Sequence, residues 1–287
     1  MTTAFWAARR GDEPAILSPL GDRTWAELNA NANRLVRALR GRGLAAGDAV
    51  AVMVANRPQF VEAWAATQRA GLRLTTINWH LTGDEAAYIV GNCGARAFLA
   101  DARFADAAAD AAEASGVEVR LAVGGTIAGF DDYDAVIAAE DGADIDDPTV
   151  GSSMLYTSGT TGRPKGVHRA QAPPTTGALA LFGYEPGASV NLCTGPLYHA
   201  APLAFSLALP MSFGATTVLM DRWTPEETLA LIERHRVTHV HMVPTMFHRL
   251  LRLPEATKAR YDLSSMRFVA STGSPCPAEV KRAMIDW

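Results

Sequence analysis

Short apolar runs alternate with helix-forming segments along most of this chain, and this alternation limits its fold more than any other feature. Residues 49–54 form an uninterrupted apolar run, as a strand buried on both faces requires. Other stretches rich in apolar residues, at 96–100, 117–123 and 237–243, are also predicted as strands. Strands that alternate with helices in this way form parallel sheets with helices on both faces. The predicted fold class is therefore α/β, with doubly wound, mostly parallel sheets sandwiched by helices.

Several helix starts carry capping sequences. Thr24 stands three residues before Glu27, and Thr82 stands three residues before Glu85, which is the spacing of a capping box. Thr224 is followed by a proline and two glutamates, so a helix is predicted over 224–235. Further strands are predicted at 75–78, 153–157, 189–193, 216–220 and 266–271, and an apolar helix at 202–212.

Charge and cysteine usage exclude several classes of protein. The 287 residues include 26 basic and 30 acidic side chains, a net charge of −4, so we expect no nucleic-acid partner. Cys93, Cys193 and Cys276 are an odd number without a close pair, which is typical of a reducing compartment. No apolar run reaches transmembrane length, and the N-terminus lacks the apolar core of a signal peptide. The sequence predicts a cytoplasmic protein without a transmembrane segment.

The segment 157–166 is the densest group of anion-binding residue types in the chain. It contains four hydroxyl side chains, three glycines and one lysine, and no acidic residue. Glycine lets backbone N–H groups approach an anion closely, and hydroxyl and ammonium groups add donors. We therefore predict that this segment binds nucleotide phosphates. The residues assigned to this role are Thr157, Ser158, Gly159, Thr160, Thr161, Gly162, Lys165 and Gly166.

The P-loop of NTPases is the main alternative, and its register does not fit. That motif needs a second glycine five residues after the first, and a hydroxyl residue after its lysine. Counted from Gly159, the second position holds Pro164, and Lys165 is followed by Gly166. The proline also removes one N–H and restricts the backbone. A P-loop-type NTPase, which would hydrolyse ATP without any acid, is disfavoured.

Residues 154–166 resemble the signature of the adenylate-forming (AMP-binding) superfamily, aliphatic-x-aromatic-Thr-Ser-Gly-Thr/Ser-Thr-Gly-x-Pro-Lys-Gly. The chain matches every fixed position, with Arg163 in the variable one. The resemblance is to the N-terminal portion of the acyl-CoA synthetase or fatty-acid–CoA ligase branch. It implies that the loop closes over the β- and γ-phosphates of ATP, with Lys165 stabilising the pyrophosphate leaving group. It also implies that Thr160, Thr161 or both hold phosphate, and Thr160 is the candidate contact to Mg²⁺ through a phosphate.

Residues 196–199 resemble the Pro-x-aromatic-His segment of the same family. The resemblance implies that Tyr198 and His199 contact the acid substrate, with His199 beside its carboxylate, and that His199 joins Lys165 and Thr160 as a catalytic residue. Ala204 falls in the helix that borders the acyl pocket in the family. The small apolar side chains of 200–205 suit a lipophilic acid, although a plain core helix explains them equally well.

Residues 271–277 resemble the family's Gly-Gly-Ala-Pro-like segment, whose backbone lies along the adenine. Gly273, Ser274 and Pro275 are carried over as adenine-binding residues. Thr272 and Ser274 replace a glycine and an alanine of the family pattern, and both are small enough to leave room for the base. Two other polar candidates, His239 and His241, share one face of the strand predicted at 237–243. They have no third ligand at metal-binding spacing, so we interpret them as strand histidines.

The resemblance implies an incomplete N-terminal AMP-binding domain with two α/β lobes. Lobe A is expected at about 48–182 and lobe B at about 1–47 plus 183–287, and the small C-terminal domain is absent. The full-length parent would use ATP and Mg²⁺ to convert a carboxylic acid, expected to be a fatty acid, to acyl-AMP. Coenzyme A, as co-substrate, would then take the acyl group as a thioester.

Several family motifs are missing before Trp287. These are a Tyr-Gly-x-Thr-Glu segment, a ribose-binding aspartate and a C-terminal domain with a catalytic lysine. The alternative hypothesis is therefore a catalytically inactive, truncated remnant that binds nucleotide weakly at most. A sheet that ends at the strand 266–271 would expose an edge, so we expect the chain to aggregate or to depend on a partner. A homodimer is left open.

Overall fold

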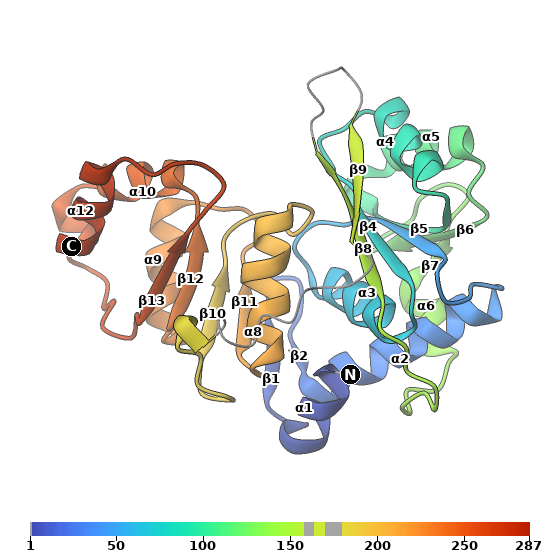
Figure 1. The fold of residues 1–287 in the computed structure, drawn as a ribbon, viewed down its shortest axis with the longest axis horizontal. Coiled ribbons are helices and arrows are strands. Elements are labelled where there is room, and N and C mark those ends of the chain that lie inside the picture. Colours follow the sequence, from blue (N-terminus) through green and yellow to red (C-terminus); the bar gives the residue numbers. More distant parts are fainter. Residues whose placement is uncertain (1, 158–163, 170–179) are drawn as a thin grey trace. The chain divides into compact units, whose positions relative to one another are not determined.

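Two compact units make up the chain. The computed structural model describes residues 2–157, 164–169 and 180–287 (Figure 1). The first unit contains Met1–Glu13 and Arg23–Pro174, and the second contains Pro14–Asp22 and Thr175–Trp287. Each unit has its own mostly parallel sheet with helices packed on it, so the predicted α/β class is confirmed.

The sheet of the first unit is parallel except at one end. Its strand order is β7-β6-β5-β3-β4-β8-β9, and β8 pairs with β9 in antiparallel fashion. The strands are β3 (Ala49–Met53), β4 (Arg73–Thr76), β5 (Ala95–Asp101), β6 (Val119–Val123), β7 (Asp131–Asp132), β8 (Ser152–Thr157) and β9 (Lys165–Arg169). The short strand β2 (Arg23–Thr24) also falls in this unit. These helices are α1 (Thr2–Arg10), α2 (Trp25–Gly41), α3 (Pro58–Arg69), α4 (Gly83–Asn92), α5 (Ala105–Ser115), α6 (Tyr133–Ala138) and the 3-10 turn η1 (Ala102–Phe104).

The central strand β3 is buried on both faces. Ala51 and Met53 pack in one cluster with alanines of α5 and with Ile89 of α4. Because side chains alternate between the two faces of a strand, Val50 and Val52 point to the opposite face, where they are equally buried. This double burial explains the uninterrupted apolar run at 49–54.

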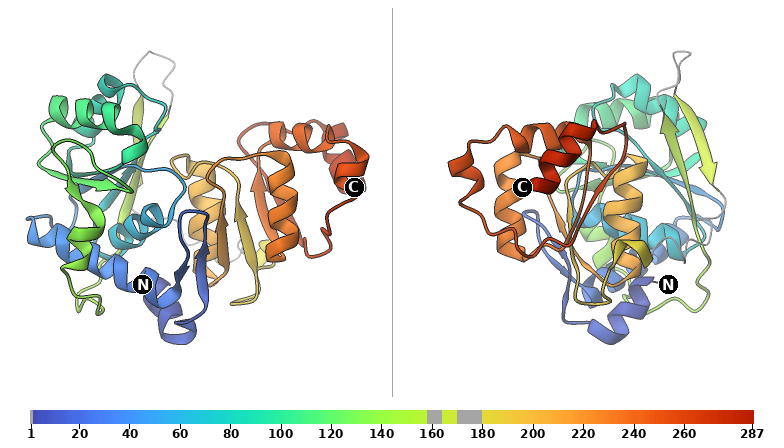
Figure 2. Two further views of the ribbon diagram at one scale, coloured as in Figure 1. Left: turned by 180° about the vertical axis from the view of Figure 1, so that it is seen from behind. Right: turned by 60° about the vertical axis from the view of Figure 1, so that its left-hand side comes forward.

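The strands of the second unit are parallel and lie in the order β13-β12-β10-β11-β1 (Figure 2). They are β1 (Pro14–Leu17), β10 (Val190–Cys193), β11 (Thr216–Leu219), β12 (His239–Met242) and β13 (Phe268–Ser271). The helices are α8 (Leu209–Ser212), α9 (Pro225–His235), α10 (Pro244–Leu251), α11 (Glu255–Lys258) and α12 (Ala278–Asp286), with the π-helix η3 (Pro202–Ala208) and the 3-10 turn η2 (Ala180–Phe182). Apolar residues of α9, α10 and α12 pack with Val240 and Met242 of β12 in one core.

The capping sequences act as predicted. The Thr24 hydroxyl accepts the backbone N–H of Glu27, and the Glu27 carboxylate accepts the Thr24 N–H, so α2 starts with a complete capping box. Thr82 makes the same box at α4. Thr224 is the N-cap of α9 and accepts the N–H of Glu227.

The division of the chain differs from the expected lobes over the first 47 residues. Most of this segment falls in the first unit because α1 packs on α2, and α2 packs on α3 and α6. Only the stretch Pro14–Asp22, which contains β1, falls in the second unit, where Ile16 and Leu17 pair with β11. Within the described ranges, no helix combines the length and the apolarity that crossing a membrane would need.

Candidate functional site

The antiparallel pair β8–β9 holds both ends of the predicted phosphate segment (Figure 1). Thr157, the last residue of β8, is opposite Lys165, the first residue of β9, and Tyr156 is opposite Gly166. Thr157, Lys165 and Gly166 are all exposed. Ser158, Gly159, Thr160, Thr161 and Gly162 lie outside the described residues, so their predicted roles stay predictions.

A close contact explains why a glycine follows Lys165. A Cβ atom at position 166 would come within 2.2 Å of Met154 Cε and 3.1 Å of Tyr156 Cζ. The Tyr156 hydroxyl donates to Asn92 Oδ1 of α4 at 2.5 Å, and burial raises the pKa of this phenol to about 12, so it stays protonated at neutral pH. The aromatic position of the signature therefore joins β8 to α4 and leaves room only for glycine on β9.

Tyr198 and His199 lie in the loop that leaves the carboxyl end of β10. Their ring centroids are 4.3 Å apart, at 52°. His199 is exposed, but partial desolvation by its neighbours lowers its pKa from the usual value, so the imidazole is neutral at pH 7. Its carbonyl accepts the N–H of Leu203, which starts the following helix.

That helix is a π-helix rather than the regular apolar helix expected at 202–212. The π-helix η3 (Pro202–Ala208) continues directly into α8, and the N–H of Leu209 bonds the carbonyl of Ala204, five residues earlier. Short π-helical turns are frequent at functional sites. Ala204 is exposed, while Phe205 is partly buried against the sheet. The wider turn therefore presents Ala204 and Phe205 in different directions.

The predicted adenine segment is an exposed turn at the carboxyl end of β13. Gly273 has φ +88°, a conformation that favours glycine, and a Cβ there would also lie 3.3 Å from Val243 Cγ1. Ser274 and Pro275 follow on the surface. The backbone N–H of Thr272 is 3.4 Å from the carbonyl of Met242 and ties the turn to β12.

The loops after β10 and β13 leave the same edge of the second unit's sheet, on either side of β12. Ligands of open α/β sheets bind at the carboxyl ends of the strands. The structure thus brings the predicted acid residues Tyr198 and His199 and the predicted adenine residues to one sheet edge. The predicted phosphate segment belongs to the first unit.

Two residues at this edge were not predicted as site residues. His241 Nε2 lies 2.7 Å from Thr272 Oγ1, and the His241 carbonyl accepts the hydroxyl of Thr194 at 2.6 Å. The ring of His241 stacks on Phe205 of the π-helix, with centroids 5.6 Å apart. The signal available in the sequence was the position of His241, one residue before the end of a strand whose neighbours carry the predicted loops.

The described residues contain no group of three His, Cys, Asp or Glu side chains that could hold a metal ion. Thr157 and Lys165 offer a hydroxyl and a cation, which suit phosphate oxygens rather than a bare metal. The donor set therefore fits Mg²⁺ only as an ion carried by a nucleotide.

The sheets and the sequence signature belong to an α/β protein, and comparison with known proteins gives its family. The family model described as AMP-binding enzyme matches residues 4–287, so the chain belongs to the AMP-binding enzyme family. The resemblance drawn from the signature at 154–166 is thereby confirmed.

The curated relatives are CoA ligases. Feruloyl-CoA synthase of Amycolatopsis sp is 31% identical over 265 residues, which cover 92% of this chain and 52% of the relative. Indoleacetate–CoA ligase of Aromatoleum aromaticum is 30% identical over 293 residues, which cover 98% of this chain and 57% of the relative. The chain spans about half the length of the curated relatives it matches.

Solved structures share the fold. The anthranilate CoA ligase AuaEII in complex with anthranoyl-AMP matches with a TM-score of 0.89 at 22% identity, over 99% of this chain and 57% of that one. ATP-bound MatB from Rhodopseudomonas palustris matches with a TM-score of 0.81 at 26% identity, over 98% of this chain and 56% of that one. The arrangement of elements is thus that of adenylate-forming ligases.

Proposed function

We propose that this chain is part of an ATP-dependent acid–thiol ligase. In the first step, a carboxylate oxygen of the acid attacks the α-phosphorus of ATP, which forms acyl-AMP and releases pyrophosphate. In the second step, the sulfur of coenzyme A attacks the acyl carbon, which forms the thioester and releases AMP. The observation that carries the proposal is the exposed Lys165 at the base of a glycine- and hydroxyl-rich segment held between β8 and β9. Its family includes CoA ligases.

Lys165 and Thr160 would bind the pyrophosphate portion of ATP. Charge builds up on the bridging and β-phosphate oxygens as the P–O bond breaks, and a fixed cation with hydroxyl donors stabilises that charge. Bound Mg²⁺ would supply further positive charge on the same phosphates, with Thr160 as its candidate contact. The attack itself needs positioning rather than covalent help from the protein.

His199 would orient the carboxylate of the acid. A neutral imidazole can donate one hydrogen bond to the carboxylate of the acid. A protonated imidazolium would form an ion pair with that carboxylate and weaken it as the nucleophile. The lowered pKa of His199 favours this neutral form at pH 7. Tyr198 packs against the His199 ring and would hold its plane.

We propose an aromatic acid as the substrate. Aromatic rings gather around the π-helix that follows His199 in the chain, where Phe205 stacks on His241 and on Phe182. The relatives named above are a feruloyl-CoA synthase and an indoleacetate–CoA ligase, which supports a ring-bearing acid. A fatty acid is the second candidate, because the apolar side chains of 200–205 suit a lipophilic acid.

Pyrophosphate exchange tests this proposal. The product of the complete reading frame that contains this sequence should exchange labelled pyrophosphate into ATP when an aromatic acid is added. Lys165→Ala should lower the exchange rate about hundredfold, in line with the loss of one charge-stabilising group. Lys281→Ala, which removes an exposed lysine of α12, should leave the rate unchanged.

The outcomes separate the candidates. Exchange with fatty acids alone would overturn the aromatic class but keep the ligase. No exchange with any acid of a broad panel, together with calorimetric binding of Mg-ATP to the 287-residue chain, would favour the alternative of a non-catalytic nucleotide-binding protein. ATP hydrolysis without any acid would contradict both.

A further inference from the structure

The phenol of Tyr156 is in contact with both α4 and β9. Its hydroxyl donates to Asn92 Oδ1 at 2.5 Å, and its ring packs on the core cluster to which α4 and α5 contribute. Gly166 of β9 also lies against it, since a Cβ atom there would come within 3.2 Å of the hydroxyl oxygen. Burial raises the pKa of the phenol to about 12, so the hydroxyl keeps the proton that it donates. The ring therefore links the end of a helix to a strand.

Asn92, the acceptor of this hydrogen bond, is held at the end of α4. The next residue, Cys93, is 3% exposed, and its N–H bonds the carbonyl of Ile89. The carbonyl of Cys93 accepts a hydrogen bond from Arg73 Nη2 of β4 at 2.7 Å. The end of α4 is thus tied to the sheet, so Asn92 offers Tyr156 an acceptor in a set position.

The strand pair that contains Tyr156 also contains both described ends of the predicted phosphate segment. Thr157 follows Tyr156 on β8, and it is paired with Lys165, which precedes Gly166 on β9. Among the described strands, β9 has a neighbour on one side only, which is β8. The position of Lys165 therefore depends on β8 and on the ring against which Gly166 packs. A functional group must be held within about 0.5 Å of its productive position, so a shift of this ring would matter.

We propose that Asn92 is a positioning residue for ATP binding, because its hydrogen bond to Tyr156 fixes the β8–β9 pair and thereby the ammonium of Lys165. This inference rests on the proposed function, in which Lys165 binds the pyrophosphate portion of ATP. Asn92 acts through Tyr156 and Gly166 and needs no contact of its own with the nucleotide. It lies 64 positions before Tyr156, outside the three segments that resemble family motifs.

A double-mutant cycle tests this contact in the product of the complete reading frame that contains this sequence. Asn92→Ala removes the acceptor, and Tyr156→Phe removes the hydroxyl but keeps the ring. In pyrophosphate exchange, each should lower kcat/KM for ATP about fivefold, the size of one net hydrogen bond, and leave the KM for the acid unchanged. The double variant should lose no more than either single variant, because the two groups act as a unit. Losses that multiply in the double variant would overturn the proposal.

Two control variants separate positioning from helix stability. Asn92→Asp keeps an acceptor oxygen, so its kcat/KM for ATP should stay within about twofold of wild type. Thr82→Ala removes the capping box at the opposite end of α4, which weakens the same helix but leaves the contact between Asn92 and Tyr156 in place. It should leave exchange unchanged. A fall in Thr82→Ala equal to that in Asn92→Ala would show that only the stability of α4 matters, and would overturn the proposal.

The failure of this inference can be distinguished from that of the proposed function. Exchange with the wild-type kcat/KM for ATP in both single variants would overturn the positioning role and keep the ligase. If no acid supports exchange, the ligase proposal fails, and calorimetric titration of the same proteins with Mg-ATP decides the role of Asn92. A rise in Kd of about fivefold in both single variants, and no more in the double variant, would then support it. An unchanged Kd, or no binding by wild type, would overturn it.

Discussion

Glu62 is a fully buried carboxylate of the first unit, and three hydrogen-bond donors converge on it. It has no exposed side-chain surface and accepts hydrogen bonds from Arg23 Nε at 2.7 Å, from Asn31 at 2.8 Å and from the Tyr133 hydroxyl at 2.8 Å. Glu62→Leu would remove the acceptor that these three side chains share, one of them charged, from the buried site. We expect it to lower the free energy of unfolding by about 3–5 kcal/mol.

Urea denaturation followed by tryptophan fluorescence would measure this change. Glu62→Gln keeps the size and one acceptor oxygen, so its loss should be clearly smaller than that of Glu62→Leu. Equal losses in the two variants, or a change below about 1 kcal/mol in Glu62→Leu, would contradict a role for the paired carboxylate.

At the scale of single residues, the sequence predicts sites whose residues lie at fixed spacings within one short segment. The predicted phosphate segment could be recognised because its pattern occupies consecutive positions, and its described ends, Thr157 and Lys165, are paired across β8 and β9. Glu62 could not be recognised, because its donors come from positions 23, 31 and 133. The contact between His241 and Thr272 was missed for the same reason, since it joins two strands 31 positions apart.

At the scale of the element, the start of α2 rests on one hydroxyl. Thr24 Oγ1 accepts the N–H of Glu27 at 3.1 Å, and Glu27 returns a bond to the Thr24 N–H at 2.8 Å. Thr24→Ala removes the first bond, so we expect the free energy of unfolding to fall by about 1 kcal/mol. Thr24→Ser should restore most of it. An unchanged urea midpoint in Thr24→Ala would show that tertiary packing alone fixes the start of this helix.

Helix starts were predictable because a capping box is local, whereas the π-helix was not. Sequence periodicity at 202–212 indicates an apolar helix but does not distinguish five-residue from four-residue hydrogen bonding. The π-helical form appears where Phe205 stacks on Phe182 and His241, which come from other elements. The π-helical hydrogen bonding of 202–208 thus occurs together with contacts to residues of other elements, which a local sequence pattern does not contain.

The strand β12 should make stability depend on pH. His239 is 2% exposed, its Nε2 donates to the Phe182 carbonyl at 2.8 Å, and its ring stacks on Tyr184 at 3.9 Å. Burial lowers its pKa in the folded state, so the unfolded state binds a proton more readily. The free energy of unfolding should therefore be greatest above the unfolded pKa of about 6.5, and should fall as the pH drops below it toward the folded value.

Urea unfolding at several pH values on either side of the ordinary histidine pKa, about 6.5, would measure how steeply the free energy of unfolding changes with pH. His199, His235 and His241 also have lowered pKa values, so they contribute in the same direction. His239→Phe keeps a ring against Tyr184 but cannot bind a proton. We expect its slope to be smaller than that of wild type by as much as about 1.4 kcal/mol per pH unit. Parallel slopes would contradict the prediction.

At the scale of the whole molecule, the fold class followed from the alternation of strands and helices, but the division into units did not. Residues 1–47 contribute to both units, because β1 pairs with β11 while α2 packs on α3. The partner of β1 lies about 200 positions along the chain, at Thr217 and Val218. Periodicity within a segment contains no information about so distant a partner.

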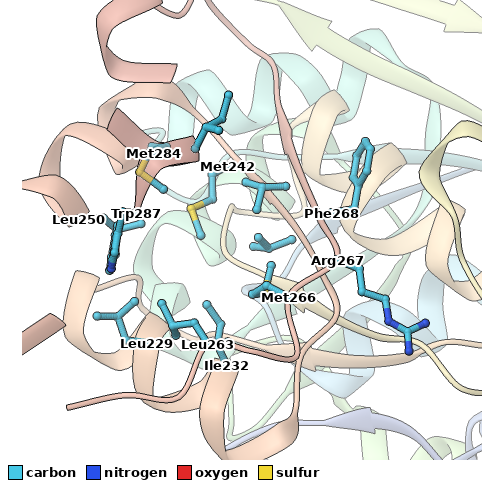
Figure 3. Close-up of a pocket in the computed structure, with 13 residues that line it drawn as sticks. Leu229, Ile232, Met242, Leu250, Leu263, Met266, Arg267, Phe268, Met284 and Trp287 are labelled. Carbon is cyan, nitrogen blue, oxygen red and sulfur yellow. The ribbon is translucent and has the colours of Figure 1, made fainter. Parts of the chain in front are cut away.

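An apolar cavity lies at the outer edge of the second unit's sheet, beside β13. β13 has no strand beyond it in the described sheet order, and a cavity of about 360 Å³ lies beside it, lined by side chains that include Met242, Leu250 and Met284 (Figure 3). Nearby, Ile285 is 82% exposed and Trp287 is 39% exposed. An unpaired strand edge next to exposed apolar side chains favours association between chains.

We therefore expect the 287-residue chain to self-associate as its concentration rises, with Ile285→Lys lowering that tendency. A lysine adds charge beside the unpaired edge, which opposes edge-to-edge pairing. Val150→Lys is the matched control, because Val150 is also largely exposed, at 66%, but lies in the first unit. Light scattering and sedimentation across a hundredfold concentration range would compare the three proteins. A wild-type chain that stays monomeric throughout, with a single cooperative melting transition, would show that this apolar edge needs no covering partner.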